Sequence, residues 1–232
     1  MGIAPADYSG DGRTDLFVSN SRGQTHAVYR AGLRGFTDTR QSLVPAFGRN
    51  LTGWGDSWVD LNNDGNLDLV LANGEIPVKN LARDARPVQV LEHVSSGFVD
   101  ATKLVGADEL PLVNGRGLAA ADFDNDGHVD LAVNSIGGKL MLLRSTGGNG
   151  HWLTVELPRF APGAVVTATL PGGRKLTQEV HVGSSYLSSE DPRVHFGLGK
   201  APKVLSITVR YLDGQVTTLR DVVADRFVTA RP

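Results

Sequence analysis

One nine-residue pattern occurs three times in this chain and constrains the fold more than any other feature. The pattern is D-x-[DNS]-x-D-G-x-x-D, and it reads DYSGDGRTD at 7–15, DLNNDGNLD at 60–68 and DFDNDGHVD at 122–130. Each copy is followed by a short apolar run, LFVSN, LVLAN or LAVNS, that is typical of a buried β-strand. Carboxylates this close together repel one another, so something must offset the repulsion.

The repeat extends beyond the acidic pattern. A glycine lies five residues before each first aspartate, at Gly2, Gly55 and Gly117. Phe36 and Phe98 belong to two G-F-x-D elements, and each precedes the next copy's first aspartate by 24 residues. The second and third copies are therefore 62 residues apart in a unit with two markers in register, whereas the first and second are 53 apart. Such self-similarity indicates a repeat protein.

The spacing within each copy is that of a calcium loop. Oxygen-bearing side chains at positions 1, 3 and 5, with glycine at 6, allow a short loop to wrap a hard cation. Position 7 would supply its backbone carbonyl, which makes its side chain irrelevant, and the aspartate at position 9 would complete the shell. About three Ca2+ ions are therefore predicted. The expected ligands are Asp7, Ser9, Asp11, Arg13 and Asp15; Asp60, Asn62, Asp64, Asn66 and Asp68; and Asp122, Asp124, Asp126, His128 and Asp130.

Other interpretations of these loops fit less well. An EF-hand requires Glu at position 12 and a following helix, but Val18, Leu71 and Val133 stand there inside apolar runs. A metal-free Asp/Asn/Gly turn remains an alternative, and magnesium is disfavoured because it keeps several waters. The third loop carries four carboxylates and the others three each, so we expect it to bind calcium most tightly.

Composition excludes several classes of protein. The 232 residues are enough for one large or two modest domains, and the chain has no cysteine, which excludes disulfides and thiolate zinc sites. No apolar run approaches the ~18 residues of a membrane helix, and no signal peptide is visible. Membrane insertion is therefore not expected. The basic residues are scattered, so nucleic-acid binding is not expected either.

At this point the residues resemble a known family. GFTD with GWGDSWVDLNNDGNLDLVLANG, and GFVD with GRGLAAADFDNDGHVDLAVNS, are similar to the FG-GAP/VCBS repeats of integrin-α-type β-propellers. The resemblance implies one four-stranded blade per repeat and a calcium ion in each loop. Ser9 departs from the usual Asp or Asn, which weakens the expectation for the first loop. Residues 1–148 would form about two and a half blades.

Residues 149–232 resemble an ASPIC/UnbV domain, which follows such repeats in bacterial secreted proteins and in the cartilage acidic protein family. The matching pieces are GSSYLS at 183–188, HFGLG at 195–199 and VRY at 209–211 before a DG turn. Tyr211-Leu212 stands where members usually have Trp-Pro, and the insert before GAV is shortened. The alternating apolar runs independently predict six or seven strands in a small sandwich or barrel.

The expected fold is therefore all-β, with partial propeller blades followed by a small β-sandwich or barrel. A propeller needs roughly four to eight blades. We expect the chain to be the C-terminal part of a longer protein, or an oligomer or partner chain to complete the ring. Met1 stands at the head of a repeat, so we expect the first blade to lack its upstream strands.

Catalytic candidates are few. A Ser/His/acid set can be assembled only from Ser184, Ser185, His181, His195, Glu190 and Asp191. No G-x-S-x-G elbow raises a serine, so we expect no catalytic constellation and no enzyme. Trp54, Trp58 and Trp152 could line a carbohydrate platform, but we expect Trp54 and Trp58 to pack between blades.

These observations favour a calcium-binding extracellular adhesion or scaffold module that binds a protein or glycan ligand. Loops with Asn and Ser ligands suit millimolar calcium, so we expect a secreted or periplasmic protein whose signal sequence lies upstream. A lectin-like glycan-binding domain and a non-catalytic portion of a secreted propeller enzyme remain alternatives.

Overall fold

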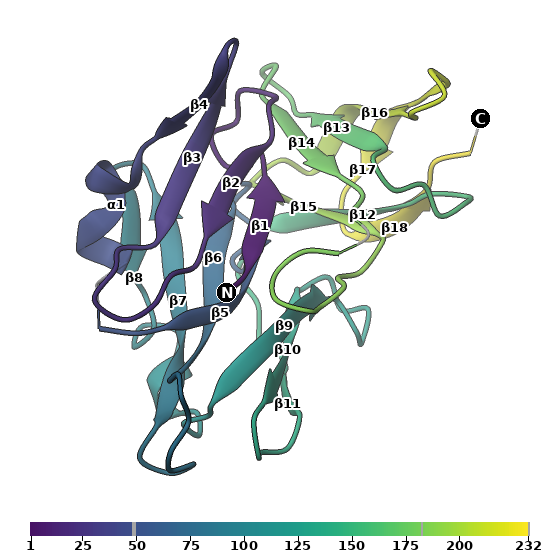
Figure 1. Cartoon of the computed structure of the whole chain (residues 1–232). Helices are drawn as coiled ribbons and strands as arrows, with labels where there is room; N and C mark the ends of the chain where they lie inside the picture. The colour runs from purple at the N-terminus through teal and green to yellow at the C-terminus, as the bar shows by residue number, and fades with distance from the viewer. Residues whose placement is uncertain (48–49, 182, 232) are drawn as a thin grey trace.

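The computed structural model describes residues 1–47, 50–181 and 183–231, and strands dominate it. The strands form five sheets (Figure 1). The described helices are α1 (Arg40–Phe47) and the 3-10 turn η1 (Ala107–Glu109). Neither is long and apolar enough to cross a membrane. The all-β expectation is confirmed.

Each of the three N-terminal sheets runs antiparallel in chain order, and in each an acidic loop joins the first strand to the second. The first sheet consists of β1 (Ile3–Ala6), β2 (Asp15–Val18), β3 (Ala27–Gly32) and β4 (Gly35–Asp38). The second consists of β5 (Gly53–Val59), β6 (Asp68–Gly74), β7 (Ala85–Val94) and β8 (Gly97–Asp100). The third consists of β9 (Gly115–Ala121), β10 (Asp130–Ser135) and β11 (Met141–Leu143).

The expectation that the first blade lacks its upstream strands is wrong. Its sheet has four strands, because β1 begins at Ile3 and pairs with β2 through Ile3 and Val18. The short sheet is the third, whose described strands include no counterpart of β4 or β8. The acidic loop joins the first strand of each sheet to the second, so only β1 precedes the first loop within its sheet.

The repeated glycines lie where one sheet's first strand meets the next element. A Cβ atom on Gly2 would lie 2.4 Å from the Trp54 carbonyl oxygen, and one on Gly55 would lie 2.6 Å from the Arg116 carbonyl oxygen. On Gly117 it would lie 2.8 Å from the Ser188 hydroxyl oxygen. At Gly2 and Gly55 only glycine permits the backbones to approach this closely, so these two glycines fix how successive sheets pack, whereas Gly117 packs against a side chain of residues 183–191.

Residues 183–191, which we call the bridging segment, lie against the first strands of all three sheets. Ser185 donates its N–H to the Ile3 carbonyl oxygen at 2.8 Å, and its hydroxyl accepts the Asp56 N–H at 2.9 Å. Asp191 donates its N–H to the Ala120 carbonyl oxygen at 3.3 Å. The bridging segment thus joins β1, β5 and β9, although it comes from the C-terminal part of the chain.

Aromatic side chains fill the space between the first and second sheets. Trp58 stacks on Tyr8 with ring centroids 5.1 Å apart and donates its indole N–H to the Ala4 carbonyl oxygen at 3.0 Å. Phe98 is buried in the same cluster. Trp54 is buried beside the bridging segment, where its ring meets Tyr186 edge-on. The Arg116 guanidinium of the third sheet lies 4.0 Å from the Trp54 ring centroid. The expectation that Trp54 and Trp58 pack between blades is confirmed, with Trp58 half-buried.

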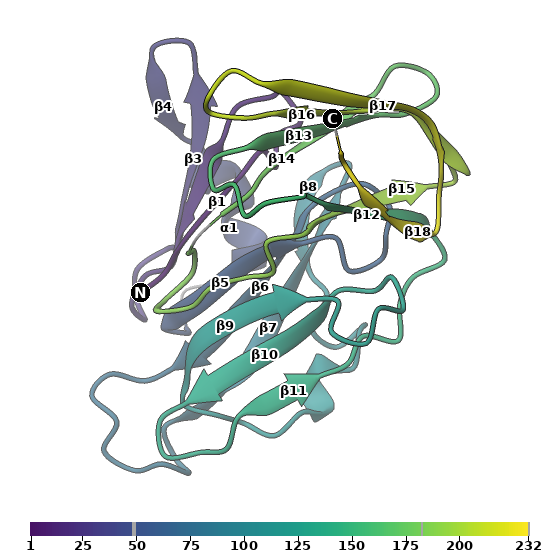
Figure 2. The same cartoon turned by 90° about the vertical axis from the view of Figure 1, so that its right-hand side faces the viewer.

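The C-terminal strands form a sandwich of two sheets, in the orders β15-β12-β18 and β14-β13-β16-β17 (Figure 2). They are β12 (His151–Glu156), β13 (Val165–Thr169), β14 (Lys175–Glu179), β15 (Val194–Gly199), β16 (Lys203–Arg210), β17 (Val216–Val223) and β18 (Arg226–Thr229). Leu153 and Phe196 from one sheet pack with Val166 and Ile207 from the other in one core. The expected six or seven strands are confirmed; Val182, within one expected run, lies outside the described residues.

The packing at Gly55 can be tested by substitution. Gly55→Ala would place a methyl group against the backbone of Arg116 and Leu118, both 2.6 Å away, so we expect a loss of about 1–3 kcal/mol in the free energy of unfolding. Gly183→Ala is the control, because its nearest neighbour would be an ordinary 3.5 Å away. Urea denaturation measures both. Equal stability of the two variants would contradict the packing role.

Candidate metal centres

The first aspartate of each acidic loop organises the turn by accepting backbone hydrogen bonds. Its carboxylate accepts the N–H groups of positions 5 and 6 in all three loops. The bonds from position 6 are Gly12 to Asp7 at 2.7 Å, Gly65 to Asp60 at 2.7 Å and Gly127 to Asp122 at 2.9 Å. These glycines have φ between 83° and 88°, which favours glycine. The repeated glycine thus permits the turn and donates its N–H to the first aspartate.

The last aspartate ties each loop to the third strand of its own sheet. One carboxylate oxygen accepts an N–H from position 2 or 3 of the loop. The other accepts an N–H from a residue in the third strand or just after it, beyond the residues that pair with the second strand. The latter bonds are Ala31 to Asp15 at 2.7 Å, His93 to Asp68 at 2.8 Å and Ser145 to Asp130 at 2.7 Å. Asp15, Asp68 and Asp130 are all buried. The three loops therefore share one hydrogen-bonding scheme despite different sequences.

The oxygen atoms of these loops fit a hard cation. In the third loop, carboxylate oxygens of Asp122, Asp124 and Asp130 all lie within 4.8 Å of one another. In the first loop the hydroxyl oxygen of Ser9, at position 3, is buried and has no hydrogen-bond partner. Calcium takes six to eight oxygen ligands, so converging carboxylates and an unpartnered buried hydroxyl suit it. These residues would hold the ion, and the ion would offset the repulsion among them.

Burial makes the loop carboxylates costly to ionise without a counter-ion. It raises the pKa of Asp60 to about 8 and that of Asp68 to about 7. The pKa values of Asp7 and Asp130 are also raised, with burial as the largest cause. A bound cation favours the ionised form and acts in the opposite direction. These acids are therefore placed where a positive charge is needed.

Arginines supply part of that charge. Arg144 donates to Asp126 at 2.8 Å and also to Asp124, and Arg13 lies 3.0 Å from Asp11. The expectation that position-7 side chains are irrelevant is therefore incomplete, since Arg13 is one of them. At the same position, Asn66 accepts a hydrogen bond from Arg174 at 2.8 Å. The loops use position 7 for contacts that the motif alone does not reveal.

The second and third loops also contact the C-terminal domain through Asn63. Its amide accepts a hydrogen bond from His195 Nε2 at 2.8 Å and donates to the Gly127 carbonyl oxygen at 3.0 Å. Burial lowers the pKa of His195 to about 4, so the ring is neutral, and its Nδ1 faces the Thr154 hydroxyl at 3.0 Å. One asparagine at position 4 thus joins two acidic loops and β15.

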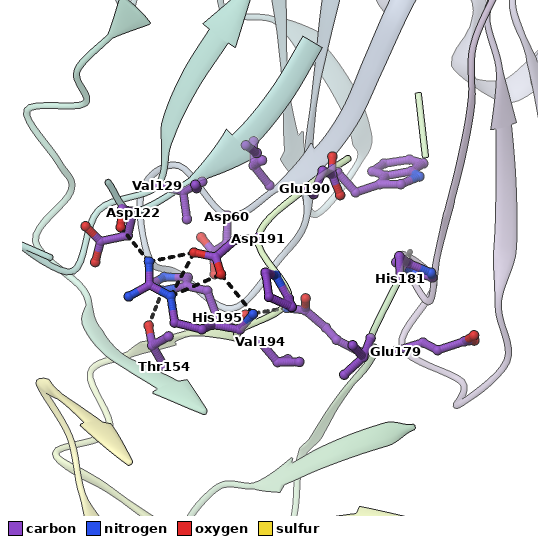
Figure 3. Close-up of a pocket in the computed structure, with 18 of the residues that line it drawn as sticks. Asp60, Asp122, Val129, Thr154, Glu179, His181, Glu190, Asp191, Val194 and His195 are labelled. Atoms are coloured by element: carbon purple, nitrogen blue, oxygen red, sulfur yellow. Dashed lines mark hydrogen bonds and ion pairs between the residues drawn. The ribbon is translucent and has the colours of Figure 1, made fainter. Parts of the chain in front are cut away.

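Two arginines of the C-terminal domain complete this contact. Arg193 donates to the Asp122 carbonyl oxygen and the Asn125 amide oxygen, both at 2.7 Å, while Asp191 holds its guanidinium. Figure 3 shows Asp122, Asp191 and His195 around this position. Arg174 donates to the Gly65 carbonyl oxygen at 2.6 Å. Sequence reasoning missed these residues; the Asn at position 4 of two loops was the available signal.

The catalytic candidates do not form a nucleophile and base. His181, His195, Glu190 and Asp191 line a pocket of about 80 Å³ between the domains (Figure 3), whereas Ser184 and Ser185 are not among its lining residues. His195 donates to Asn63, and the Ser185 hydroxyl accepts the Asp56 N–H; among the described residues, no hydrogen bond joins a candidate serine to a candidate histidine. Glu190 is half-buried and accepts a hydrogen bond from Ser57, and desolvation raises its pKa. The contacts of His195 and Ser185 join the domains.

Comparison with known proteins supports both parts of the sequence interpretation. Residues 7–71 match the family model of the FG-GAP-like repeat, and residues 154–232 match that of ASPIC and UnbV. Cartilage acidic protein 1 of Homo sapiens is 31% identical over 228 residues, which are 94% of this chain and 33% of that protein. The Xenopus tropicalis and Mus musculus proteins of that name are 31% and 30% identical, with 34% of each covered. The chain spans about a third of these relatives' length, and the recognition of the two modules is confirmed.

We expect the order of calcium affinities among the loops to follow the number of carboxylates in each. Position-5 variants Asp11→Asn, Asp64→Asn and Asp126→Asn remove one carboxylate from each loop at equivalent places. Because the third loop holds four carboxylates, we expect Asp126→Asn to abolish the tightest binding event in calorimetry. If the tightest binding event persists in Asp126→Asn and disappears in Asp11→Asn or Asp64→Asn, the expected order of affinities is wrong.

Proposed function

We propose that this chain is a calcium-binding extracellular adhesion or scaffold module that presents a rigid surface to a protein or glycan ligand. The observation that carries the proposal is the hydrogen-bonding scheme that the three acidic loops share, and two of these loops also contact the C-terminal domain. When bound, calcium supplies the positive charge that the loop carboxylates require. The chain's own residues then fix the shape of each turn and the contact made through Asn63.

An extracellular setting is supported by the kind of loop and by the relatives. Loops with Ser9 or Asn62 among their expected ligands suit the millimolar calcium found outside cells. The relatives carry the name cartilage acidic protein. The serine and histidine side chains serve domain contacts, so we propose a non-catalytic role for this part of the protein.

A glycan ligand is the second candidate, and one cleft favours it. A cleft of about 470 Å³ lies between the first two loops and the β13–β14 turn. Tyr8 and His93 line one side, and Arg174 and Lys175 line the other. Aromatic rings and cationic groups together suit a sugar that carries carboxylate or sulfate groups. This cleft is where a lectin-like activity would reside.

Calcium removal tests the main proposal. A ligand that binds only the folded state stabilises it by about 2.7 kcal/mol at a concentration 100 times its Kd. We therefore expect EGTA to lower the melting temperature, as measured by circular dichroism, and calcium to restore it. An unchanged melting temperature would refute calcium binding.

A matched pair of variants makes this test specific to the loops. The triple variant Asp7→Asn, Asp60→Asn and Asp122→Asn removes the position-1 carboxylates and should lose the calcium effect. Asp108→Asn removes an exposed acid outside the loops and should retain it. A calcium effect of equal size in both proteins would show that the ion binds elsewhere.

Glycan binding can be tested separately. On an array of neutral and sulfated or carboxylated glycans, we expect the chain to retain only anionic ones, with loss of binding in Lys175→Gln. Lys139→Gln is the charge-matched control, because Lys139 is exposed in the turn between β10 and β11 of the third sheet. Retention of anionic glycans by Lys175→Gln would exclude this cleft as the site.

A further inference from the structure

The third sheet has an open outer edge beside an apolar groove. Its last strand, β11, pairs with β10, and no described strand pairs with its other side. A groove of about 740 Å³ runs between this edge and the second sheet. Leu104 and Leu142, which line it, are 81% and 61% exposed. Apolar side chains beside unpaired backbone groups are typical of a strand-docking surface.

The first two sheets show what occupies this position elsewhere in the chain. There the outer edge is covered by a G-F-x-D strand, β4 or β8. Asp38 pairs with Tyr29 and Asp100 with Leu91, while Phe36 pairs with Ala31 and Phe98 with His93. The outer edge of the third sheet corresponds to the edges that β4 and β8 cover in the first two sheets. After β11, however, the chain continues to β12, and no described strand covers this edge.

The residues around Phe98 have counterparts around the groove. Phe98 contacts Tyr8 at position 2 of the first loop, His93 and Phe47, with ring centroids 6.0, 4.5 and 5.9 Å away. The corresponding residues one repeat later are Leu61 at position 2 of the second loop and Ser145, which donates to Asp130 as His93 does to Asp68. Leu110 follows η1, one residue past the position that the 62-residue period assigns to Phe47.

Leu61, Ser145 and Leu110 all line the groove. The groove therefore lies where an aromatic side chain lies one repeat earlier. It is also continuous with the apolar core that already joins the second and third sheets, which includes Val88, Val90 and Leu131. An incoming aromatic residue would extend an existing interface rather than create one.

We propose that the edge of β11 and this groove bind an extended segment of a partner protein with the pattern aromatic-x-Asp, as an antiparallel fourth strand. By the register of the other sheets, the aromatic residue would lie opposite Ser145 and the aspartate opposite Leu143. The main chain supplies affinity and the aromatic pocket supplies specificity. The proposal states which kind of protein segment the interaction module would bind. It rests on the proposed function only in assuming that the module has a protein ligand.

A peptide from the chain's own second sheet serves as the probe. The peptide VSSGFVDAT, residues 94–102, carries the G-F-x-D strand, and its control replaces Phe98 by alanine. With calcium-loaded protein and fluorescence anisotropy, we expect saturable one-to-one binding that weakens about tenfold or more with the control peptide, which corresponds to about 1.4 kcal/mol. Absence of saturable binding, or equal binding of the two peptides, would overturn the proposal.

Protein variants locate the site. Leu142→Glu places a charge at the groove on an exposed side chain, and Leu212→Glu does the same on the C-terminal domain, where Leu212 is 81% exposed. We expect about tenfold weaker peptide binding for Leu142→Glu and none of that loss for Leu212→Glu. Circular dichroism shows whether each variant is folded, and equal peptide affinity of the two folded variants would overturn the assignment.

Two further measurements separate this proposal from its neighbours. Sedimentation across the same concentration range would reveal self-association; a dimer that Leu142→Glu abolishes would make a second copy the occupant and overturn the foreign partner. The peptide titration uses protein whose calcium stabilisation has already been measured. Failure of peptide binding by calcium-stabilised protein therefore overturns strand docking alone and leaves the calcium function standing.

Discussion

The rest of the structure depends on the hydrogen bonds that backbone N–H groups donate to buried aspartate carboxylates in each acidic loop. Asp60 binds the N–H of Gly65, and Asp68 binds that of His93, so one turn is tied both to itself and to its sheet. Burial raises the pKa of Asp60 to about 8, which shows how strongly this arrangement favours a nearby positive charge. The fixed turn then presents Asn63 to the C-terminal domain.

Features that a short, repeated sequence pattern encodes could be predicted from the sequence. The acidic loops, the strands after them and the all-β class follow from Asp, Gly and apolar residues at fixed spacing. The glycines before each loop were visible as markers, but their physical role was not. The backbone atoms that require Gly2 and Gly55 to lack a side chain belong to Trp54 and Arg116, which lie in other parts of the chain.

Contacts between distant residues could not be predicted, because no local pattern encodes them. Asn63 and His195 are 132 residues apart, and nothing in either segment indicates the other. The same holds for the bridging segment, where Ser185 pairs with Ile3 and completes the contact among the first strands. The error about the first blade had a different cause: the motif identifies the loop but not its place within the sheet. That place became clear only from the pairing of β1 with β2.

The arginines around the loops divide by the atoms that they bind, and this division explains how one loop can serve two purposes. Arg193 and Arg174 bind backbone carbonyl oxygens of the loops, at Asp122 and Gly65, and leave the carboxylates there free to bind a cation. Arg144 instead binds the carboxylates of Asp124 and Asp126. A cation in the third loop would therefore compete with Arg144 but not with Arg193. Ion binding and domain contact use different atoms of the same turn, so the first can strengthen the second.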